Sequence, residues 1–370
     1  MGSVAKGTGV EEKTLVIRAD AGPLIGTGHV MRCLALAQVW KDVGGRVVLG
    51  TSPESQSLEA RLRRHGVDVR YLSKRPGSVD DALQTVGLAM RERAGWVVAD
   101  GYHFNDEYQE RIKNAGLKLL LIDDYGHADH YSADLVLNQN IYARSDLYPS
   151  RETCTRLLLG SRYVLLRREF LRWSGWKREI KERACNILVT LGGSDPDNGT
   201  VLIVKALTRL ADFDCEVRIV TGPSNPHAET VEKAISRRNM RIVETVDDMP
   251  ALMAWADMAV SAGGSTCWEM SYMGLPFLTV VLADNQKEIA LGLDTAGIAE
   301  NLGWFSDLSE DRIMERVSEM ITNREKRERF SVNGRLLIDG EGAFRIVRHI
   351  LDGQALSPVN EHPAAGRCMP

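Results

Sequence analysis

Three adjoining stretches near the start of the chain decide the fold: TLVIR (residues 14–18), AGPLIGTG (residues 21–28) and HVMRCLALAQVW (residues 29–40). The first is a short apolar run typical of a buried strand, and the last has apolar residues at helical spacing. The glycines between them allow a tight turn. This strand, turn and helix are typical of the first unit of a parallel α/β sheet.

The same alternation continues along the chain. Further strands are predicted at residues 46–49, 67–72, 96–99 and 118–122, with helices at 57–65 and 105–115. After a polar, basic stretch at 167–183 the pattern restarts, with strands at 186–190, 216–220, 241–244, 258–261 and 277–281, and a helix at 200–210. Strands that alternate with helices indicate a parallel sheet covered on both faces.

The fold class is therefore predicted to be α/β, with two Rossmann-like domains and a cleft between them. Residues 13–166 are predicted to form the N-terminal domain, which carries the catalytic and sugar sites, and residues 167–354 the C-terminal, nucleotide-binding domain. Residues 1–12 and 355–370 are predicted to be flexible tails. Ligands of open α/β sheets bind beyond the carboxyl ends of the strands, so the segments that follow each strand are the candidates for function.

Composition excludes several classes of function. The 370 residues carry a formal net charge of −4, which argues against bulk binding of nucleic acid or acidic membranes. The six cysteines are scattered without a C-x-x-C pair, as expected in a reducing cytosol. Neither a signal peptide nor a membrane span is recognisable, so we expect a soluble, cytoplasmic protein. No cofactor is expected.

The first glycine-rich turn provides a candidate general base. Gly26 and Gly28 place His29 in the first turn of the predicted helix. A helix N-terminus disfavours an imidazolium, so the ring is expected to stay neutral and able to accept a proton. The alternative is that His29 only caps the helix or packs, but its position directly after a strand and a glycine turn favours the base.

This turn does not match two common nucleotide-binding motifs. A dinucleotide fingerprint requires glycine or alanine at position 31, which is methionine, and the ribose-binding acid is absent after the second strand, at residues 50–52. A P-loop requires G-K-[ST] after the glycines, which is also absent.

Two turns in the second half are suited to a diphosphate. LGGSDPDN (residues 191–198) and SAGGSTCWEM (residues 261–270) each follow a predicted strand and open a helix, where free N–H groups attract anions. Glu269 lies one helical turn further on, in a position to accept hydrogen bonds from ribose hydroxyls. The alternative is that both segments are ordinary glycine turns with Ser or Thr caps.

Polar clusters follow three other strands. The neutral amides of DNQ (residues 284–286) suit sugar hydroxyl or acetamido groups, although a capping loop is an equal alternative. Acidic residues end two strands of the first half, at residues 100–102 and 123–125, and we expect them to support the site or to accept hydrogen bonds from substrate hydroxyls. The group Asp123, Asp124, His127 and His130 offers metal-ligand atoms, but we predict no metal site.

Taken in order, these segments resemble the PseG-type UDP-sugar hydrolases of pseudaminic acid biosynthesis, which are similar in architecture to GT-B glycosyltransferases such as MurG. The resemblance spans residues 14–351. It rests on these motifs: RADA (18–21), IGTGHVMRCLALA (25–37), ADGY (99–102), IDDYG (122–126), DLVLNQN (134–140), LGSRYVLLRREF (159–170), TLGGSDPDN (190–198), SAGGSTCWE (261–269) and ADNQ (283–286). The loop at residues 21–23 departs from the serine-rich loop of the family, which could alter contacts with the sugar.

The resemblance implies a GT-B-type architecture and a reaction. Such enzymes remove UDP from UDP-2,4-diacetamido-2,4,6-trideoxy-β-L-altropyranose by inverting attack of water at the anomeric carbon, without a metal. By motif, His29 is the base and Tyr102 lines the sugar site. The phosphates are held by Gly193, Ser194, Gly264, Ser265 and Thr266, the ribose by Glu269, and the sugar or diphosphate region by Asn285 and Gln286. The other substrate-binding positions predicted are Arg18, Asp20, Gly28 and Asp100.

Two alternatives stay open. A GT-B glycosyltransferase would use the same UDP-sugar donor site with an acceptor hydroxyl in place of water, and a non-catalytic module would bind the nucleotide sugar without cleaving it. The predicted partner in every case is a small nucleotide-sugar molecule rather than nucleic acid. The chain is expected to be a monomer or a weak homo-oligomer.

Overall fold

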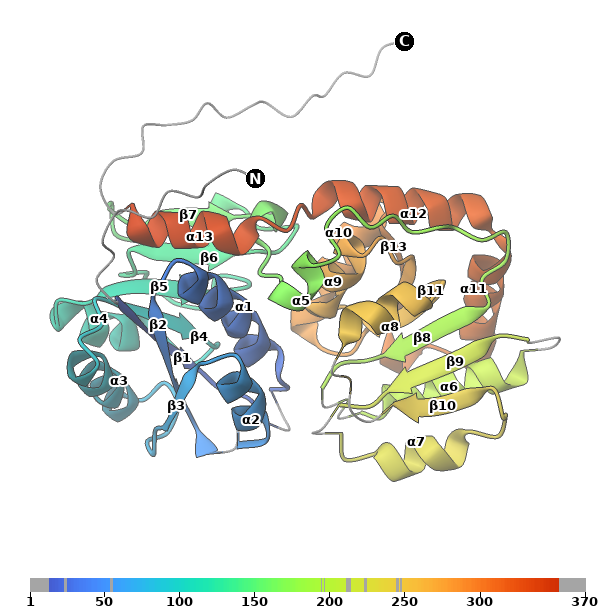
Figure 1. The fold of residues 1–370 in the computed structure, drawn as a ribbon, viewed down its shortest axis with the longest axis horizontal. Helices are drawn as coiled ribbons and strands as arrows, with labels where there is room; N and C mark the ends of the chain where they lie inside the picture. Colours follow the sequence, from blue (N-terminus) through green and yellow to red (C-terminus); the bar gives the residue numbers. More distant parts are fainter. Residues whose placement is uncertain are drawn as a thin grey trace, which may run out of the picture.

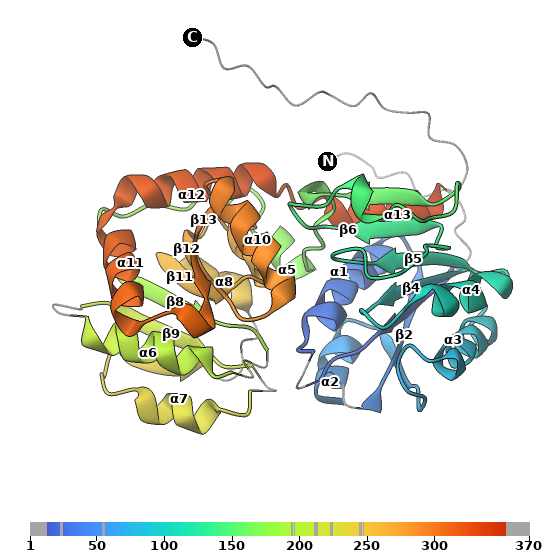
Figure 2. The same ribbon diagram turned by 180° about the vertical axis from the view of Figure 1, so that it is seen from behind.

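The computed structural model describes residues 13–352 except 23, 24, 54, 55, 194, 196, 211–213, 223, 224, 244, 245 and 247. Ser194, one of the predicted phosphate-binding residues, and the two predicted tails lie outside the described residues. The described chain forms two α/β units that lie side by side (Figure 1), and Figure 2 shows the same arrangement from behind.

The first unit contains a seven-stranded parallel sheet with the order β3-β2-β1-β4-β5-β6-β7. Its strands are β1 (Thr14–Ala19), β2 (Arg46–Thr51), β3 (Asp68–Tyr71), β4 (Trp96–Asp100), β5 (Lys118–Ile122), β6 (Leu135–Asn138) and β7 (Arg156–Leu159). The apolar runs recognised in the sequence form the central strands because both faces of a parallel sheet are covered by helices.

The second unit contains a six-stranded parallel sheet with the order β10-β9-β8-β11-β12-β13. Its strands are β8 (Asn186–Thr190), β9 (Glu216–Val220), β10 (Met240–Val243), β11 (Met258–Ala262), β12 (Phe277–Val281) and β13 (Ala299–Trp304). The predicted α/β class with two Rossmann-like sheets is confirmed.

Helices connect the strands. In the first unit they are α1 (Gly28–Asp42), α2 (Gln56–Arg64), α3 (Val79–Arg91) and α4 (Asp106–Asn114), followed by the short α5 (Arg168–Leu171). The later helices are α6 (Gly199–Arg209), α7 (Ala228–Ala234), α8 (Met249–Trp255), α9 (Thr266–Tyr272), α10 (Asp284–Thr295), α11 (Glu310–Thr322), α12 (Arg324–Leu337) and α13 (Gly342–Leu351). Within the described residues, none of these helices is long and apolar enough to cross a membrane.

The strand order explains where the functional loops meet. In the first sheet the order changes direction between β1 and β4, so the loops that follow these two strands diverge and leave a crevice. Ala19 of β1 is the register partner of Asp100 of β4, which brings the glycine turn before α1 beside the end of β4. In the second sheet the corresponding pair is β8 and β11, whose following loops carry the two other glycine turns.

The last helix returns to the first unit. α13 lies over the blue and green unit in both views (Figures 1 and 2), although it follows α12 of the second unit. Ala343, Ile346, Val347 and Ile350 share one buried cluster with residues of β1 and α1. The predicted division at residue 166 assigned this segment to the C-terminal domain, whereas its apolar face packs on the N-terminal core.

Gly342, the first residue of α13, allows this helix to dock closely. A Cβ at position 342 would lie 2.2 Å from the carbonyl oxygen of Val164.

Gly342→Ala is therefore expected to destabilise the protein by about 1–3 kcal/mol, as overpacking against rigid backbone does. The matched control is Gly87→Ala in α3, where the nearest atom to the new Cβ is the end of the Arg91 side chain at 3.5 Å. Removing this mid-helix glycine should stabilise by about 0.5–1 kcal/mol. Urea unfolding of both variants checks the pair, and equal effects would contradict the close docking of α13.

Candidate active site

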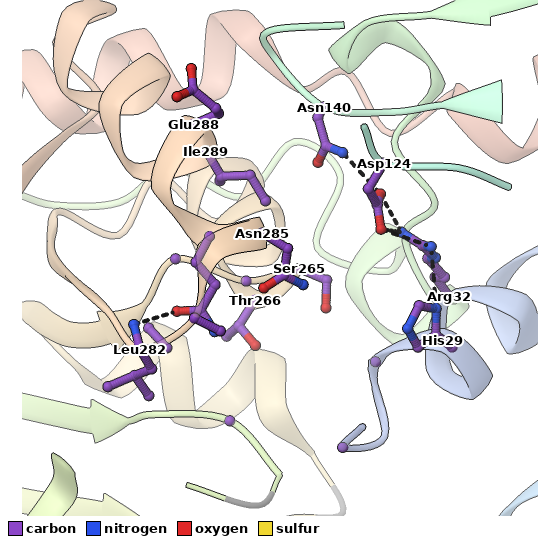
Figure 3. Close-up of a pocket in the computed structure, with 18 of the residues that line it drawn as sticks. His29, Arg32, Asp124, Asn140, Ser265, Thr266, Leu282, Asn285, Glu288 and Ile289 are labelled. Carbon is purple, nitrogen blue, oxygen red and sulfur yellow. Dashed lines mark hydrogen bonds and ion pairs between the residues drawn. The ribbon is translucent and has the colours of Figure 1, made fainter. Parts of the chain in front are cut away.

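A cavity of about 890 Å³ lies between the two units, at the carboxyl ends of both sheets. Figure 3 shows His29, Arg32, Asp124 and Asn140 on one side of it and Ser265, Thr266, Asn285 and Glu288 on the other. Residues from both units line this cavity. This is expected, because in each sheet the strand order changes direction at one point, and the loops that diverge there leave a crevice for a ligand. The predicted shared cleft is therefore present.

His29 lies on the wall of this cavity, in the first turn of α1. Its Nδ1 is 2.6 Å from Oδ1 of Asp100, and the Asp100 side chain is fully buried. Burial alone would raise the pKa of Asp100, but the charges of Arg32 and His29 and their hydrogen bonds outweigh it and hold that pKa well below its usual range. An ionised Asp100 accepts the Nδ1 proton of His29. In the neutral ring, the lone pair is then on Nε2, the nitrogen that Asp100 does not engage.

Arg32 holds the carboxylate that orients His29. It lies one turn further along α1 and donates from Nε and one terminal nitrogen to Asp100, both at 2.7 Å. Its other terminal nitrogen donates to Asp124 at 2.8 Å, and all three side chains are buried. The cluster holds one positive and two negative charges. The net charge of this buried cluster is therefore negative.

Tyr102 links this cluster to the second unit. Its hydroxyl donates to Oδ2 of Asp124 at 2.8 Å and accepts from the Asn285 side chain at 3.0 Å. Its ring meets His29 edge to face, with centroids 5.0 Å apart. Burial and the charge of Asp124 raise the pKa of Tyr102 far above its usual value, so the hydroxyl keeps its proton and remains a donor. Tyr102 and Asn285, which were each predicted to bind the substrate, thus meet across the cavity.

The glycine turns of the second unit face His29. Gly193, Gly264, Ser265 and Thr266 all line the cavity. A Cβ at Gly264 would meet no atom within 4 Å, so the backbone of this turn is open to a ligand. The turns of the two units approach closely, because a Cβ at Gly193 would lie 3.0 Å from the Thr27 hydroxyl. The structure thus brings these four residues together with His29 around one space.

Gln286 shapes the wall rather than only lining it. Its side-chain oxygen accepts from the backbone N–H of Leu282 at 3.0 Å, which fixes the turn between β12 and α10. A Cβ at Gly263 would lie 2.9 Å from the Gln286 carbonyl oxygen, so this glycine lets α10 pack against the turn that carries Gly264. Asn285 and Gln286 are thereby held at the edge of the cavity.

Four of the described site residues that the sequence predicts do not line this cavity: Arg18, Asp20, Glu269 and Asp100, which acts on His29 from behind it. Arg18 is fully buried and pairs with Asp20 and Asp81. Asp20 lines a smaller, adjoining cavity. Glu269 accepts from Arg167 at 2.7 Å, and burial raises its pKa although Arg167 opposes that shift. The structure therefore does not bring Arg18 or Glu269 to the wall, and a ribose contact of Glu269 stays a prediction.

Two functional residues escaped the sequence analysis. Arg32 and Asn140, which donates to Asp124 at 2.9 Å, were assigned no role. The signal for Arg32 is its position, because a buried arginine three residues after a candidate base, in an otherwise apolar helix, requires a carboxylate partner. Within the described part of the chain, no group of three or more His, Cys, Asp or Glu is arranged to hold a metal ion.

Comparisons with known proteins agree with this architecture. Residues 186–334 match the model of the glycosyltransferase family 28 C-terminal domain. The chain is 28% identical to the spore coat polysaccharide biosynthesis protein SpsG of Bacillus subtilis, over 91% of this chain and 97% of that protein. It is 24% identical to the UDP-2,4-diacetamido-2,4,6-trideoxy-beta-L-altropyranose hydrolase of Campylobacter jejuni, over 76% of this chain and 97% of the relative.

The solved structure of Acinetobacter baumannii MurG is similar with a TM-score of 0.63 and 16% sequence identity, over 92% of this chain and 99% of that one. At this identity the likeness concerns the fold. The chain therefore has the GT-B fold, with two parallel-sheet α/β domains around one cleft, and its second half matches the family 28 C-terminal domain.

Proposed function

We propose that this chain hydrolyses a UDP-activated sugar, with His29 as the general base that activates water for attack at the anomeric carbon. The observation that carries the proposal is the His29–Asp100 pair, at 2.6 Å, on the wall of a cavity whose opposite wall is formed by open glycine turns. A base with its Nε2 lone pair free, across from a diphosphate site, is the arrangement that this reaction requires.

Each wall has a separate task in the proposed mechanism. The turns with Gly193, Gly264 and Ser265 hold the diphosphate through backbone N–H groups and stabilise the charge that develops on UDP as it leaves. His29 takes a proton from water as the oxygen bonds to the anomeric carbon and the bond to the UDP oxygen breaks. The resulting imidazolium is stabilised by the net negative charge of the cluster formed by Asp100, Arg32 and Asp124. Because UDP leaves as an anion, no acid is required on the leaving-group side.

The class of sugar is also part of this proposal. The Campylobacter jejuni relative is named for hydrolysis of UDP-2,4-diacetamido-2,4,6-trideoxy-beta-L-altropyranose. The alignment with it extends over 76% of this chain. We therefore infer a substrate of this type, a deoxy sugar with acetamido groups, attached to UDP.

A GT-B glycosyltransferase is the second candidate, and one observation favours it. The matching domain model and the MurG likeness both belong to glycosyltransferases, which place an acceptor hydroxyl where a hydrolase places water. In that case His29 would deprotonate the acceptor, and the donor site would be unchanged.

The experiment that separates the two candidates uses the donor alone. Purified protein is incubated with the UDP-diacetamido sugar in the absence of any acceptor, and free UDP and free sugar are followed by NMR. We expect stoichiometric release of both over many turnovers. Release of UDP that is slow alone and accelerates when a cellular acceptor fraction is added would overturn the hydrolase in favour of the transferase.

A further inference from the structure

Asn140 is a buried polar side chain on the wall of the main cavity, and the proposed mechanism does not use it. The residue follows β6 in the first unit and is only 1% exposed, yet it lines the cavity. Figure 3 shows it on the same side as Asp124 and Arg32, across from Glu288 and Ile289 of α10. Buried amides normally have partners for their polar atoms, so the partners of Asn140 indicate its role.

One end of this amide is already bound. Its Nδ2 donates to Oδ1 of Asp124 at 2.9 Å. Burial alone would raise the pKa of Asp124, but the charge and the hydrogen bonds of Arg32 outweigh burial and hold that pKa below its usual range. An ionised carboxylate can only accept hydrogen bonds, so the nitrogen of the amide and not its oxygen must face Asp124. The orientation of the Asn140 side chain is therefore fixed by its neighbour.

The other end of the amide, Oδ1, faces the cavity. Figure 3 shows the Asn140 amide with its nitrogen toward Asp124 and its oxygen on the side of α10. Within the described part of the chain, the side chain forms its hydrogen bond through Nδ2, and Oδ1 is not among the buried atoms that are sealed off without a partner. An oxygen of this kind can accept a hydrogen bond from a ligand in the cavity.

The backbone also holds Asn140 in this position. Its N–H donates to Oδ1 of Asn138 at 3.0 Å. The side chain of Asn138 donates in turn to the carbonyl oxygen of Asp124 at 2.8 Å and to the hydroxyl of Tyr148 at 2.9 Å. Asn138 and Tyr148 are both fully buried. Oδ1 of Asn140 is thus a preorganised acceptor, because little conformational freedom is left to lose when a ligand binds.

The position of Asn140 indicates which part of a nucleotide sugar it meets. Its partner Asp124 also binds Arg32 and Tyr102, which are neighbours of His29. The glycine turns that are proposed to hold the diphosphate belong to the other unit, across the cavity. With the diphosphate there, a ligand group that reaches Oδ1 belongs to the sugar. This group must carry a hydrogen, as a hydroxyl or the N–H of an acetamido group does.

We propose that Asn140 determines specificity for the sugar by accepting a hydrogen bond at Oδ1 from one hydroxyl or acetamido N–H of the substrate. This inference rests on the proposed use of a nucleotide sugar, but it does not depend on whether water or a hydroxyl attacks the anomeric carbon. It also predicts what the site rejects. An ether or ester oxygen at the same place cannot donate, so Oδ1 would be left buried and unpaired.

The test removes donors from the ligand and the acceptor from the protein. Calorimetry measures the affinities of UDP, of the UDP-diacetamido sugar, and of three analogues that each lack one donor, with O-acetyl in place of acetamido at position 2 or 4, or with no hydroxyl at position 3. The full-length His29→Ala protein, in which turnover is expected to be slow, is compared with the same protein carrying Asn140→Leu, which has a similar size, or Asn140→Ala. Tyr148→Phe is the control, because it removes a hydrogen bond behind Asn138 but no atom that lines the cavity.

For one of the three donors, we expect its loss to weaken binding at least about tenfold when Asn140 is present and about twofold or less in Asn140→Leu and Asn140→Ala. Tyr148→Phe should keep the tenfold preference, and the affinity for UDP should be equal in all proteins.

Four results would overturn this role of Asn140. In the first, none of the three donors matters in the protein that retains Asn140. In the second, both Asn140 variants keep the preference. In the third, the Asn140 variants weaken binding of all the sugars equally, or of UDP in parallel, so that the residue only holds Asp124 in place. In the fourth, Tyr148→Phe abolishes the preference as well, so that discrimination depends on the loop as a whole.

The two proposals fail separately. If the unmodified protein releases no UDP from the sugar while Asn140 still discriminates between the analogues, the hydrolase proposal fails and the role of Asn140 stands. If UDP is released but discrimination is independent of Asn140, only the role of Asn140 fails.

Discussion

His29→Ala is expected to lower the turnover of the UDP-sugar by about 10²–10⁴-fold, the range that a positioned general base contributes. The reason is geometric. Asp100 holds the ring through Nδ1, and Nε2 is the only basic nitrogen of that ring left to face the cavity. Alanine removes the proposed base but leaves the glycine turns of the other unit intact. The affinity for UDP should therefore stay within about twofold, because no group that is proposed to hold the diphosphate has changed.

The measurement combines initial rates of UDP release with calorimetric titration of UDP. His130→Ala is the matched control, because His130 is partly exposed, pairs with Glu152 and does not line the cavity. Its rate should equal that of the unmodified protein. A His29→Ala protein that keeps its turnover would remove His29 from the role of base, and one that loses UDP binding in parallel would place the residue in binding instead.

Arg32→Met is expected to cost about 3–5 kcal/mol of stability, the usual effect of removing one partner from a buried ion pair. Arg32 donates to both Asp100 and Asp124, and without it two buried carboxylates lose their cation and repel one another. Methionine fills a similar space, so the loss reports the charges rather than a cavity. Urea unfolding at pH 7 measures it. Arg209→Met, at an exposed arginine that pairs with Glu310, is the control and should change stability little.

The pH dependence of the same variant separates charge from packing. In the unmodified protein the folded-state pKa values of Asp100 and Asp124 are depressed, because Arg32 and His29 together outweigh the effect of burial. Their contribution is therefore present above the unfolded pKa, about 3.9, and is lost only as the pH falls below it. Without Arg32, we expect burial and the repulsion between the two carboxylates to raise both pKa values above those of the unfolded chain. The variant should then regain stability as the pH falls from 7 toward 5, because the two carboxyls take up protons. A variant that loses stability over this range would contradict the role of Arg32 as the cation that keeps both carboxyls ionised.

Much of the fold follows from local sequence. The buried strands at residues 14–18 and 186–190 are predicted because both faces of a parallel strand are apolar, and β1 and β8 confirm them. Strands β6, β7 and β13 were not predicted. β6 and β7 have only four residues each, and β13 mixes polar residues and a glycine into its sequence, so periodicity was a weak signal there.

The candidate site was predictable only in part. The turn glycines and His29 follow directly after strands, which is a local pattern. The partners of His29 are not local, because Asp100 is 71 residues away and its proximity depends on the pairing of β1 with β4. The docking of α13 on the first unit was likewise beyond local reasoning, since its apolar face is compatible with either core.

The most direct test of the proposed reaction is the position of oxygen-18 after turnover in labelled water. If His29 directs water to the anomeric carbon, the label is found in the released sugar and the UDP contains none. Label in the UDP would mean that water attacks phosphorus, and a role of the His29–Asp100 pair in activating water toward the sugar would be contradicted.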